Sequence, residues 1–490
     1  MTIIDRIAEY SEEHGLFDCD VIIAGCSGGP DSMALMEILS DLKESGRINC
    51  DIRCVHINHN LRPGDCIADQ ELVSSYCKDR GIPLKIFSFD VSSLARANKL
   101  SEETQGRKLR YKAFSDYKDE IGPGLNVRIA TAHHMDDLAE TMLMNLFRGA
   151  GLKGLITPRP IAGDIIRPLL CVRKAELEGF LTDRGIRFAT DSTNELSCCT
   201  RNVWRNDIIP EIAKSRGLSD DPVRQLYKTN LLLEEDWNFI ETEALKAFSQ
   251  VSDGDAVRVS GITGLHKSIR SRILRMLWLN SFDSLTDLES VNIEYCDKAL
   301  MQEGSVELDM PFARKFIKHG DLAMFTSVPR DAYFYIAGRM GYLTYKEPLS
   351  LDISSGLETV IGDLSISASS VTIENKDELE YNNYSWFYPL NNKRGEITIT
   401  NALANASDLD LCFAKAGQSG SKKIRRLYTD LKIPKLVRDC ILYVRSGDKI
   451  LWIPGYGHSE GFTSSLSRSR YIEQAPECNR FLKLEIRKAH

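Results

Sequence analysis

The chain has 490 residues, of which 43% are hydrophobic and 27% are charged, and its formal net charge is −7. This composition is ordinary for a globular protein, argues against wholesale disorder, and allows about three domains. The sequence lacks any run of about 18 apolar residues, and its N-terminal segment has no secretory leader. We therefore expect a cytoplasmic protein without a membrane-spanning helix.

Thirteen cysteines are scattered along the chain, and none of them forms a C-x-x-C pair. In a large chain without a leader, such cysteines are expected to be reduced thiols. Zinc ribbons and iron–sulfur clusters of the usual spacing are therefore largely excluded.

The net charge conceals an asymmetry between the two ends of the chain. Residues 411–490 hold 16 Lys and Arg against 7 Asp and Glu, so this tail carries +9 and the remaining residues carry −16. An acidic body with a basic tail is typical of a protein that contacts nucleic acid at one end. A solvated basic surface without a partner remains the alternative.

Short apolar runs alternate with helical segments over the first 200 residues. The runs that we expect to be strands are 20–25, 51–58, 84–89 and 127–132. This alternation predicts a doubly wound α/β domain with a parallel sheet, in which ligands bind at the carboxyl ends of the strands. The expected domains are a catalytic domain at 1–215, a mainly helical domain at 216–330, and a β-rich α+β region at 331–490 that ends in a basic subdomain at about 408–490.

The sequence SGGPDS lies between the strand predicted at 20–25 and a helical segment that begins MALMEIL. Glycines let the backbone present N–H groups to an anion, and the following helix adds partial positive charge. Ser27 and Ser32 can donate to phosphate oxygens, and Asp31 can orient those donors or help to hold Mg²⁺. The motif therefore predicts a pyrophosphate-binding loop made of Ser27, Gly28, Gly29, Pro30, Asp31 and Ser32. A capped strand–helix turn without a ligand is the structural alternative.

A second cluster, HHMDDLAET at 133–141, follows the strand predicted at 127–132. Apolar residues at helical spacing predict a buried helix face formed by Met135, Leu138, Met142 and Leu146. Asp136 and Asp137 at the start of this helix can bind Mg²⁺, accept a proton or hold an ammonium group. Acidic residues also stabilise helix N-termini without any catalytic role.

A third cluster combines DSTN at 191–194 with two arginines one helical turn apart, Arg201 and Arg205. Their spacing would let both guanidinium groups grip phosphate, although surface salt bridges explain the same residues equally well.

The SGGPDS loop resembles that of the N-type ATP pyrophosphatases, which transfer AMP to a carbonyl oxygen and release pyrophosphate. The ordered set SGGPDS, HINHNLRPG, RKLRY, HHMDDLAET, RGAGLKGL, IIRPLL and DSTN…RN..R resembles the tRNA(Ile)-lysidine synthetases more specifically. That resemblance covers about residues 20–212 and continues more weakly to the end of the chain.

The resemblance implies an ATP-dependent ligase that adenylates the wobble cytidine of a CAU-anticodon tRNA(Ile) and then joins lysine to its C2. It implies ATP and Mg²⁺ as cofactors, tRNA(Ile) and L-lysine as substrates, and leaves a homodimer open. The catalytic positions that it implies are Asp31, Asp136, Asp137, Arg201 and Arg205. Arg107 and Arg110 match the phosphate-side arginines of the family.

The chain departs from the family pattern at three places. Leu138 replaces a usual glutamine, Gly106 replaces a usual alanine, and the R-x-x-G-D-R segment expected before GSKKI is missing. The first departure puts a polar role at that position in doubt, and the third puts the strength or position of tRNA binding by the tail in doubt.

The tail retains features of an RNA-binding surface. An apolar stripe at helical spacing is formed by Ile424, Leu427, Tyr428 and Leu431. The candidate phosphate contacts lie largely off this stripe and are Lys422, Lys423, Arg425 and Arg426.

Three other enzymes with this loop, and one non-enzyme, are the alternatives. A tRNA thiolase usually needs cysteine pairs, and a glutamine-fed amidotransferase needs a glutaminase domain; both features are missing from the sequence. A small-molecule synthetase such as NAD synthetase would not need a basic tail. A catalytically dead RNA-binding protein is disfavoured because the acidic and arginine positions are intact.

Overall fold

The computed structural model describes residues 1–58, 63–189, 200–215, 221–286, 288–373, 383–390, 396–415, 420–458 and 480–488. The predicted DSTN loop at 191–194 lies outside these residues. Contacts within the chain define two compact units, Met1–Phe239 and Ile240–His490. Within the described residues, no helix combines the length and the apolar character needed to cross a membrane.

The first unit is built on a six-stranded sheet with the order β3-β2-β1-β4-β6-β5. All four predicted strands are present, and their bounds are β1 (Val21–Gly25), β2 (Asp51–Asn58), β3 (Leu84–Ser88) and β4 (Val127–Ala130). They pair in parallel, and β6 (Ile165–Ile166) continues the parallel pairing, whereas the edge strand β5 (Ile161–Ala162) is antiparallel. The predicted doubly wound α/β fold is therefore confirmed.

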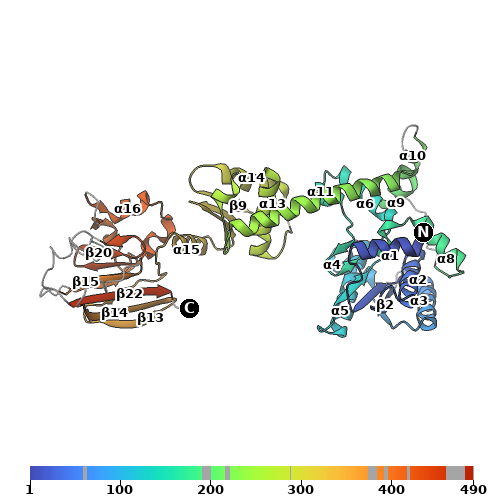
Figure 1. The fold of residues 1–490 in the computed structure, drawn as a ribbon, viewed down its shortest axis with the longest axis horizontal. Coiled ribbons are helices and arrows are strands. Elements are labelled where there is room, and N and C mark those ends of the chain that lie inside the picture. Colours follow the sequence, from blue (N-terminus) through green and yellow to red (C-terminus); the bar gives the residue numbers. More distant parts are fainter. Residues whose placement is uncertain are drawn as a thin grey trace. The chain divides into compact units, whose positions relative to one another are not determined.

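Helices cover both faces of this sheet, because successive strand residues point to opposite sides. Ile22 and Ala24 pack into the core cluster that includes α2, whereas Val21 and Ile23 pack with Phe114 of α5. In Figure 1, α5 lies on one side of β2, and α2 and α3 lie on the other. The helices of the unit are α1 (Ile3–Glu13), α2 (Pro30–Glu44), α3 (Pro63–Asp79), α4 (Val91–Asn98), α5 (Glu102–Ile121), α6 (Met135–Phe147), α7 (Leu152–Leu155), α8 (Lys174–Asp183), α9 (Thr200–Val203) and α10 (Ile209–Lys214).

The long helix α11 (Pro222–Val251) begins in the first unit and ends in the second. The next part of the second unit combines the helices α12 (Val259–Ile262), α13 (Lys267–Phe282), α14 (Ser290–Met301) and α15 (Pro329–Arg339) with a sheet. That sheet has the order β7-β8-β11-β10-β9 and consists of β7 (Ser252–Asp253), β8 (Ala256–Arg258), β9 (Val306–Met310), β10 (Arg314–His319) and β11 (Leu322–Thr326).

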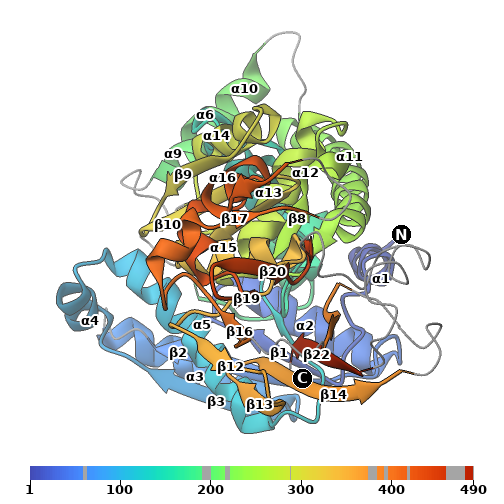
Figure 2. The same ribbon diagram turned by 90° about the vertical axis from the view of Figure 1, so that its left-hand side faces the viewer.

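The rest of the second unit is mainly antiparallel sheet, as the sequence predicts. One sheet contains β12 (Ser350–Asp352), β16 (Thr398–Thr400), β19 (Tyr443–Ser446), β20 (Lys449–Ile453) and β21 (Gly457–His458). Another contains β13 (Leu357–Ile361), β14 (Leu364–Thr372), β22 (Arg480–Lys488) and β15 (Ser385–Pro389). Figure 2 shows β13, β14 and β22 side by side. A shared core joins the two sheets, with the rings of Trp386 and Trp452 stacked at 5.9 Å.

The basic segment of the tail forms a short sheet and one helix. The strands β17 (Cys412–Phe413) and β18 (Lys422–Lys423) pair, and α16 (Ile424–Asp430) follows directly. Ile424, Leu427 and Tyr428 are 0–5% exposed, which confirms the apolar stripe over the helix itself.

The prediction for α6 is correct except at its end. Met135, Leu138 and Met142 are buried, but Leu146 is 52% exposed. Periodicity places Leu146 on the same face, yet within the described residues no core cluster reaches the last turn of this helix.

Candidate active site

The SGGPDS loop connects β1 to α2 at the carboxyl edge of the sheet. Gly28 has a φ of 92°, a left-handed conformation that favours glycine. Pro30 stands at the start of α2, where its missing N–H costs no hydrogen bond. Ser32 Oγ accepts from the Ser27 backbone N–H at 3.1 Å and donates to the Gly29 carbonyl at 3.0 Å. The loop is therefore held by its own serine, with α2 directed away from it.

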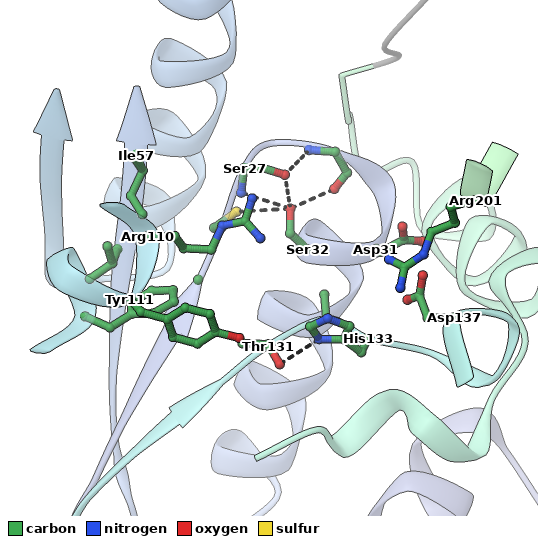
Figure 3. A pocket seen from close by; sticks show the side chains of 16 residues that line it. Ser27, Asp31, Ser32, Ile57, Arg110, Tyr111, Thr131, His133, Asp137 and Arg201 are labelled. Atoms are coloured by element: carbon green, nitrogen blue, oxygen red, sulfur yellow. Dashed lines mark hydrogen bonds between the residues drawn. The ribbon is translucent and has the colours of Figure 1, made fainter. Parts of the chain in front are cut away.

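A cavity of about 340 Å³ opens beside this loop (Figure 3). It brings together the ends of β1, β2 and β4 with residues of α5, α6 and α9. The charged and polar residues that line it are Ser27, Asp31, Ser32, Arg110, Tyr111, Thr131, His133, Asp137 and Arg201. The two clusters that the sequence separates by about 100 residues thus meet in one cavity, as expected for strands of a parallel sheet.

Asp31 has an oxygen without a partner. Its Oδ1 is buried and makes no hydrogen bond within the described residues, and its side chain is 29% exposed overall. A buried polar atom that lacks a partner costs free energy, so binding of a hydrogen-bond donor or a cation at this oxygen would be favourable. Asp31 therefore fits a magnesium ion, although no cluster of three protein ligands exists among the described residues.

The His134 side chain lies among three aspartates. It is 1% exposed, and its ring nitrogens lie 3.5 to 3.6 Å from carboxylate oxygens of Asp31, Asp136 and Asp137. Burial disfavours the charged imidazole, but the three carboxylates outweigh burial and raise the pKa of His134 to about 10. The ring is therefore an imidazolium at neutral pH, and it lowers the pKa of Asp136 and Asp137 in turn.

The two neighbouring aspartates face different surroundings. Asp137 lines the cavity, whereas Asp136 is not among the lining residues. Asp136 accepts from the Arg173 side chain at 3.0 Å and from the Lys174 backbone N–H at 2.8 Å, so it holds the start of α8. Burial alone would raise the pKa of each aspartate, but His134 and other partners lower both.

The predicted arginines converge on a residue that the sequence analysis did not choose. Glu140 is 0% exposed and accepts from Arg205 Nε at 2.6 Å. Arg201 lies 3.4 Å from the same carboxylate and donates to Thr141 Oγ1 at 3.0 Å. In Figure 3 the Arg201 guanidinium lies beside Asp31 and Asp137. Of the two arginines, only Arg201 lines the cavity. Arg205 contacts the same Glu140 carboxylate without lining the cavity.

The arginines of α5 also separate. Arg110 lines the cavity, and its side chain has no hydrogen bond or ion pair within the described residues. Arg107, one turn earlier, donates to Tyr111 Oη at 3.3 Å and is absent from the cavity lining. Arg110 is therefore the cation of this pair that is available to an anion in the cavity.

His133 is a lining residue that the sequence analysis left unassigned. Its Nδ1 lies 3.0 Å from Thr131 Oγ1. Burial and nearby arginines lower the pKa of His133 to about 4, even though Asp137 acts in the opposite direction. Of two adjacent histidines, His133 is thus neutral and His134 charged at neutral pH, because three carboxylates surround the His134 ring whereas arginines lie near His133.

The basic residues of the tail are exposed, but they are not equivalent. Lys422 pairs with Asp430 at 2.6 Å, and Lys423 lies 3.6 Å from Asp410. Arg425 and Arg426 have no side-chain hydrogen bond or ion pair within the part of the chain that the structure describes. The two arginines are the cations of α16 most available to an external anion.

This combination of loop, sheet and cavity defines a PP-loop ATP-binding protein. The family model described as the PP-loop domain matches residues 2–212, and the model described as the TilS substrate C-terminal domain matches residues 410–473. The first match contains every residue of the cavity described above.

Whole-chain relatives identify the particular family. The tRNA(Ile)-lysidine synthase of Caldanaerobacter subterraneus subsp. tengcongensis is 30% identical over 476 residues, covering 96% of this chain and 97% of that protein. The tRNA(Ile)-lysidine synthase of Clostridium tetani is 30% identical over 90% of this chain and 91% of that protein. The chain belongs to the tRNA(Ile)-lysidine synthase family.

A solved structure also resembles part of the chain. The U34-tRNA thiolase NcsA from Methanococcus maripaludis, with its [4Fe-4S] cluster, has a TM-score of 0.38 and 19% identity, covering 47% of this chain and 78% of that chain. So low a score supports no conclusion about activity.

Proposed function

We propose that this protein uses ATP to join lysine to C2 of the wobble cytidine in a CAU-anticodon tRNA(Ile), through an adenylated tRNA and with release of AMP and pyrophosphate. The observation that carries the proposal is the cavity that combines the SGGPDS loop with Asp137, Arg201 and Arg110, in a chain of the tRNA(Ile)-lysidine synthase family. Transfer of an adenylyl group needs positioned donors and neutralised charge more than a covalent protein intermediate.

The loop and the arginines would hold the nucleotide. The N-terminus of α2 and the loop N–H groups favour phosphate oxygens, and Arg110, which has no ion pair within the described residues, adds a cation to the same cavity (Figure 3). Arg201 adds a second cation, which Glu140 and Thr141 keep in place. These groups would stabilise the negative charge that develops as pyrophosphate leaves.

Magnesium fits Asp31, whose buried Oδ1 has no other partner within the described residues. Because Mg²⁺ commonly binds through one or two carboxylates together with phosphate oxygens and water, a single aspartate is sufficient on the protein side. When bound, the ion would supply charge neutralisation at the phosphates. Asp31 would hold it, and the His134 ring lies 3.6 Å from the other oxygen of that carboxylate.

Asp137 would hold the ammonium group of lysine. A carboxylate with a lowered pKa is a weak base but a good counterion, and Asp137 is the member of the aspartate pair that lines the cavity. Asp136 would act only through structure, because Arg173 and Lys174 already use its oxygens.

The test is incorporation of radiolabelled lysine into a tRNA(Ile) transcript, with and without ATP, and with a transcript whose wobble cytidine is replaced. We expect incorporation that requires both ATP and the cytidine. If the wild-type protein does not label the unaltered transcript even when ATP is present, the proposed function is refuted.

A paired comparison locates the lysine contact. Asp137→Asn should still form adenylated tRNA but consume it slowly, whereas Asp136→Asn should mainly lower the thermal stability of the first unit. If Asp137→Asn cannot form the adenylated species, this residue serves the nucleotide or its metal instead.

For the tail, we propose that α16 and its neighbours bind the body of the tRNA through phosphate contacts. The support is the +9 charge of residues 411–490 and the arginines Arg425 and Arg426, which have no ion pair within the described residues. We also propose that the chain has three domains, with boundaries near residues 215 and 330, and that the last domain ends in a basic subdomain that begins at about residue 408.

A further inference from the structure

The last turn of α6 exposes an aromatic side chain where the sequence pattern predicts only a continuation of the core. Phe147 is 75% exposed, and Leu146 before it is 52% exposed. The ring of Trp204 packs against Phe147, with centroids 5.2 Å apart and planes inclined at 36°. Two large rings therefore form one surface, which we call the aromatic ledge (Phe147 and Trp204).

Exposed cations lie close to the ledge in the sequence. Arg148 and Lys153 are exposed and make no ion pair or side-chain hydrogen bond within the described residues. Arg201, three residues before Trp204, keeps 44% of its side chain exposed. Aromatic rings combined with positive charge are the features with which proteins bind single-stranded nucleic acid, since every base has a π-face and each nucleotide carries a phosphate. A protein partner would not require the cations.

The ledge is attached to the two elements that line the cavity. Phe147 is at the end of α6, the helix that begins beside Asp137, and Trp204 directly follows α9, which carries Arg201. Ten residues of helix separate Asp137 from Phe147, which corresponds to about 15 Å along the axis. The hydrogen bond of 3.0 Å between Arg201 and Thr141 ties α9 to the middle of α6, so the ledge and the cavity are held on one support.

We propose that the aromatic ledge stacks an unpaired base of the anticodon loop that lies a few nucleotides from the cytidine in the cavity. This inference rests on the proposed function, because it requires that a single-stranded loop enter the site. An enzyme that acts on a base must remove it from its stacked neighbours, and a ring surface nearby would compensate a displaced neighbour for the stacking that it loses. The ledge would thus contribute affinity for the loop and not chemistry.

The decisive variant is Phe147→Ala, with Phe239→Ala as its matched control. Phe239 is 69% exposed on α11 and lies outside the cavity lining, so both changes remove one exposed phenyl ring. We expect Phe147→Ala to weaken binding of a CAU anticodon stem-loop RNA about tenfold, with the same loss for full-length tRNA. Phe147→Trp should restore the affinity, and Phe239→Ala should match the wild type.

Two further readouts separate stacking from other roles. The slope of log affinity against log salt should not change in Phe147→Ala, since stacking releases no counterions. The affinity for ATP and the thermal midpoint should also stay at wild-type values, because the ring is exposed and outside the cavity.

Wild-type affinity of Phe147→Ala for the stem-loop RNA would overturn the inference. So would a change of oligomeric state with unchanged RNA affinity, which would make the ledge a protein contact. These outcomes differ from failure of the proposed function, in which the wild-type protein itself would not attach lysine to tRNA.

Discussion

Arg205, which lies next to the cavity residues, and the two arginines of α16 have opposite surroundings, although the sequence makes all three candidates for contacts with phosphate. Arg205 donates to Glu140 at 2.6 Å, and the side chain of Glu140 is 1% exposed, so a buried partner holds this guanidinium. Arg425 and Arg426 lie on the outer face of a short helix without partners in the described residues. Fixed cations suit a reaction that needs groups placed to within fractions of an ångström, whereas free cations suit the binding of a long polyanion.

The comparison shows where the removal of a charged side chain lowers the stability of the protein. Around the cavity, four carboxylates (three aspartates and Glu140) are paired with four cations, which are His134, Arg173, Arg201 and Arg205. Removing one member leaves another buried and uncompensated, which costs far more than an exposed pair contributes. Removing one arginine of α16 should cost almost no stability.

The largest effect is expected at Asp31. Asp31→Ala should reduce ATP-dependent release of pyrophosphate by at least about a hundredfold, because it removes the carboxylate beside the phosphate loop. Binding of tRNA should stay near the wild-type value, since the basic tail belongs to the other unit. Pyrophosphate release and filter binding measure the two quantities. Release at the wild-type rate would show that the loop does not hold ATP.

The next largest effect is expected when Arg205, the main partner of the buried Glu140, is removed. Arg205→Ala should destabilise the first unit by about 3 to 5 kcal/mol, because Glu140 is left buried without its main partner. That corresponds to a midpoint lower by about 10 °C in calorimetry. Replacing Arg205 and Glu140 together by Met should recover most of this loss. Arg426→Ala provides the contrast, with a midpoint within about 1 °C of the wild type.

A pH effect of intermediate size should come from His133. Its pKa in the folded protein is lowered to about 4, whereas the unfolded chain takes up the proton near the ordinary value of 6.5. Stability that is complete above pH 6.5 is therefore lost as the pH falls toward 4, by up to about 3 kcal/mol. His133→Asn should flatten this acid limb, as followed by hydrogen exchange of α6 amides between pH 4 and 7. Parallel curves for the two proteins over that range would contradict the assignment.

The smallest effect separates the four basic residues of the tail. Replacing Arg425 and Arg426 together by Ala should weaken tRNA binding about tenfold at physiological salt and reduce the log–log salt slope by about 1.4 to 1.8. The pair Lys422 and Lys423 should matter less, because each lysine already has an acidic neighbour.

An unchanged slope in both double variants would place the tRNA contact elsewhere in the chain. The KM for tRNA should rise more than kcat falls, as expected for a group that binds without taking part in chemistry.

The sequence alone determined the fold class and the position of the nucleotide loop. Apolar runs at 20–25, 51–58, 84–89 and 127–132 alternate with helical segments, which predicts parallel strands, and the glycine-rich SGGPDS turn lies between one of these strands and a helix. The ordered motifs also sufficed to identify the family, because they constrain spacing as well as residue type.

Only the tertiary structure decided the role of each charged residue. Helical spacing puts Asp136 and Asp137 on one turn, but it does not say which of them meets Arg173, 37 residues away, and which meets the cavity. The same holds for Glu140 and Arg205, which are 65 residues apart. Charge states depend on burial and on neighbours from distant segments, so a local pattern shows which residues can act and the packed structure shows which of them face the site.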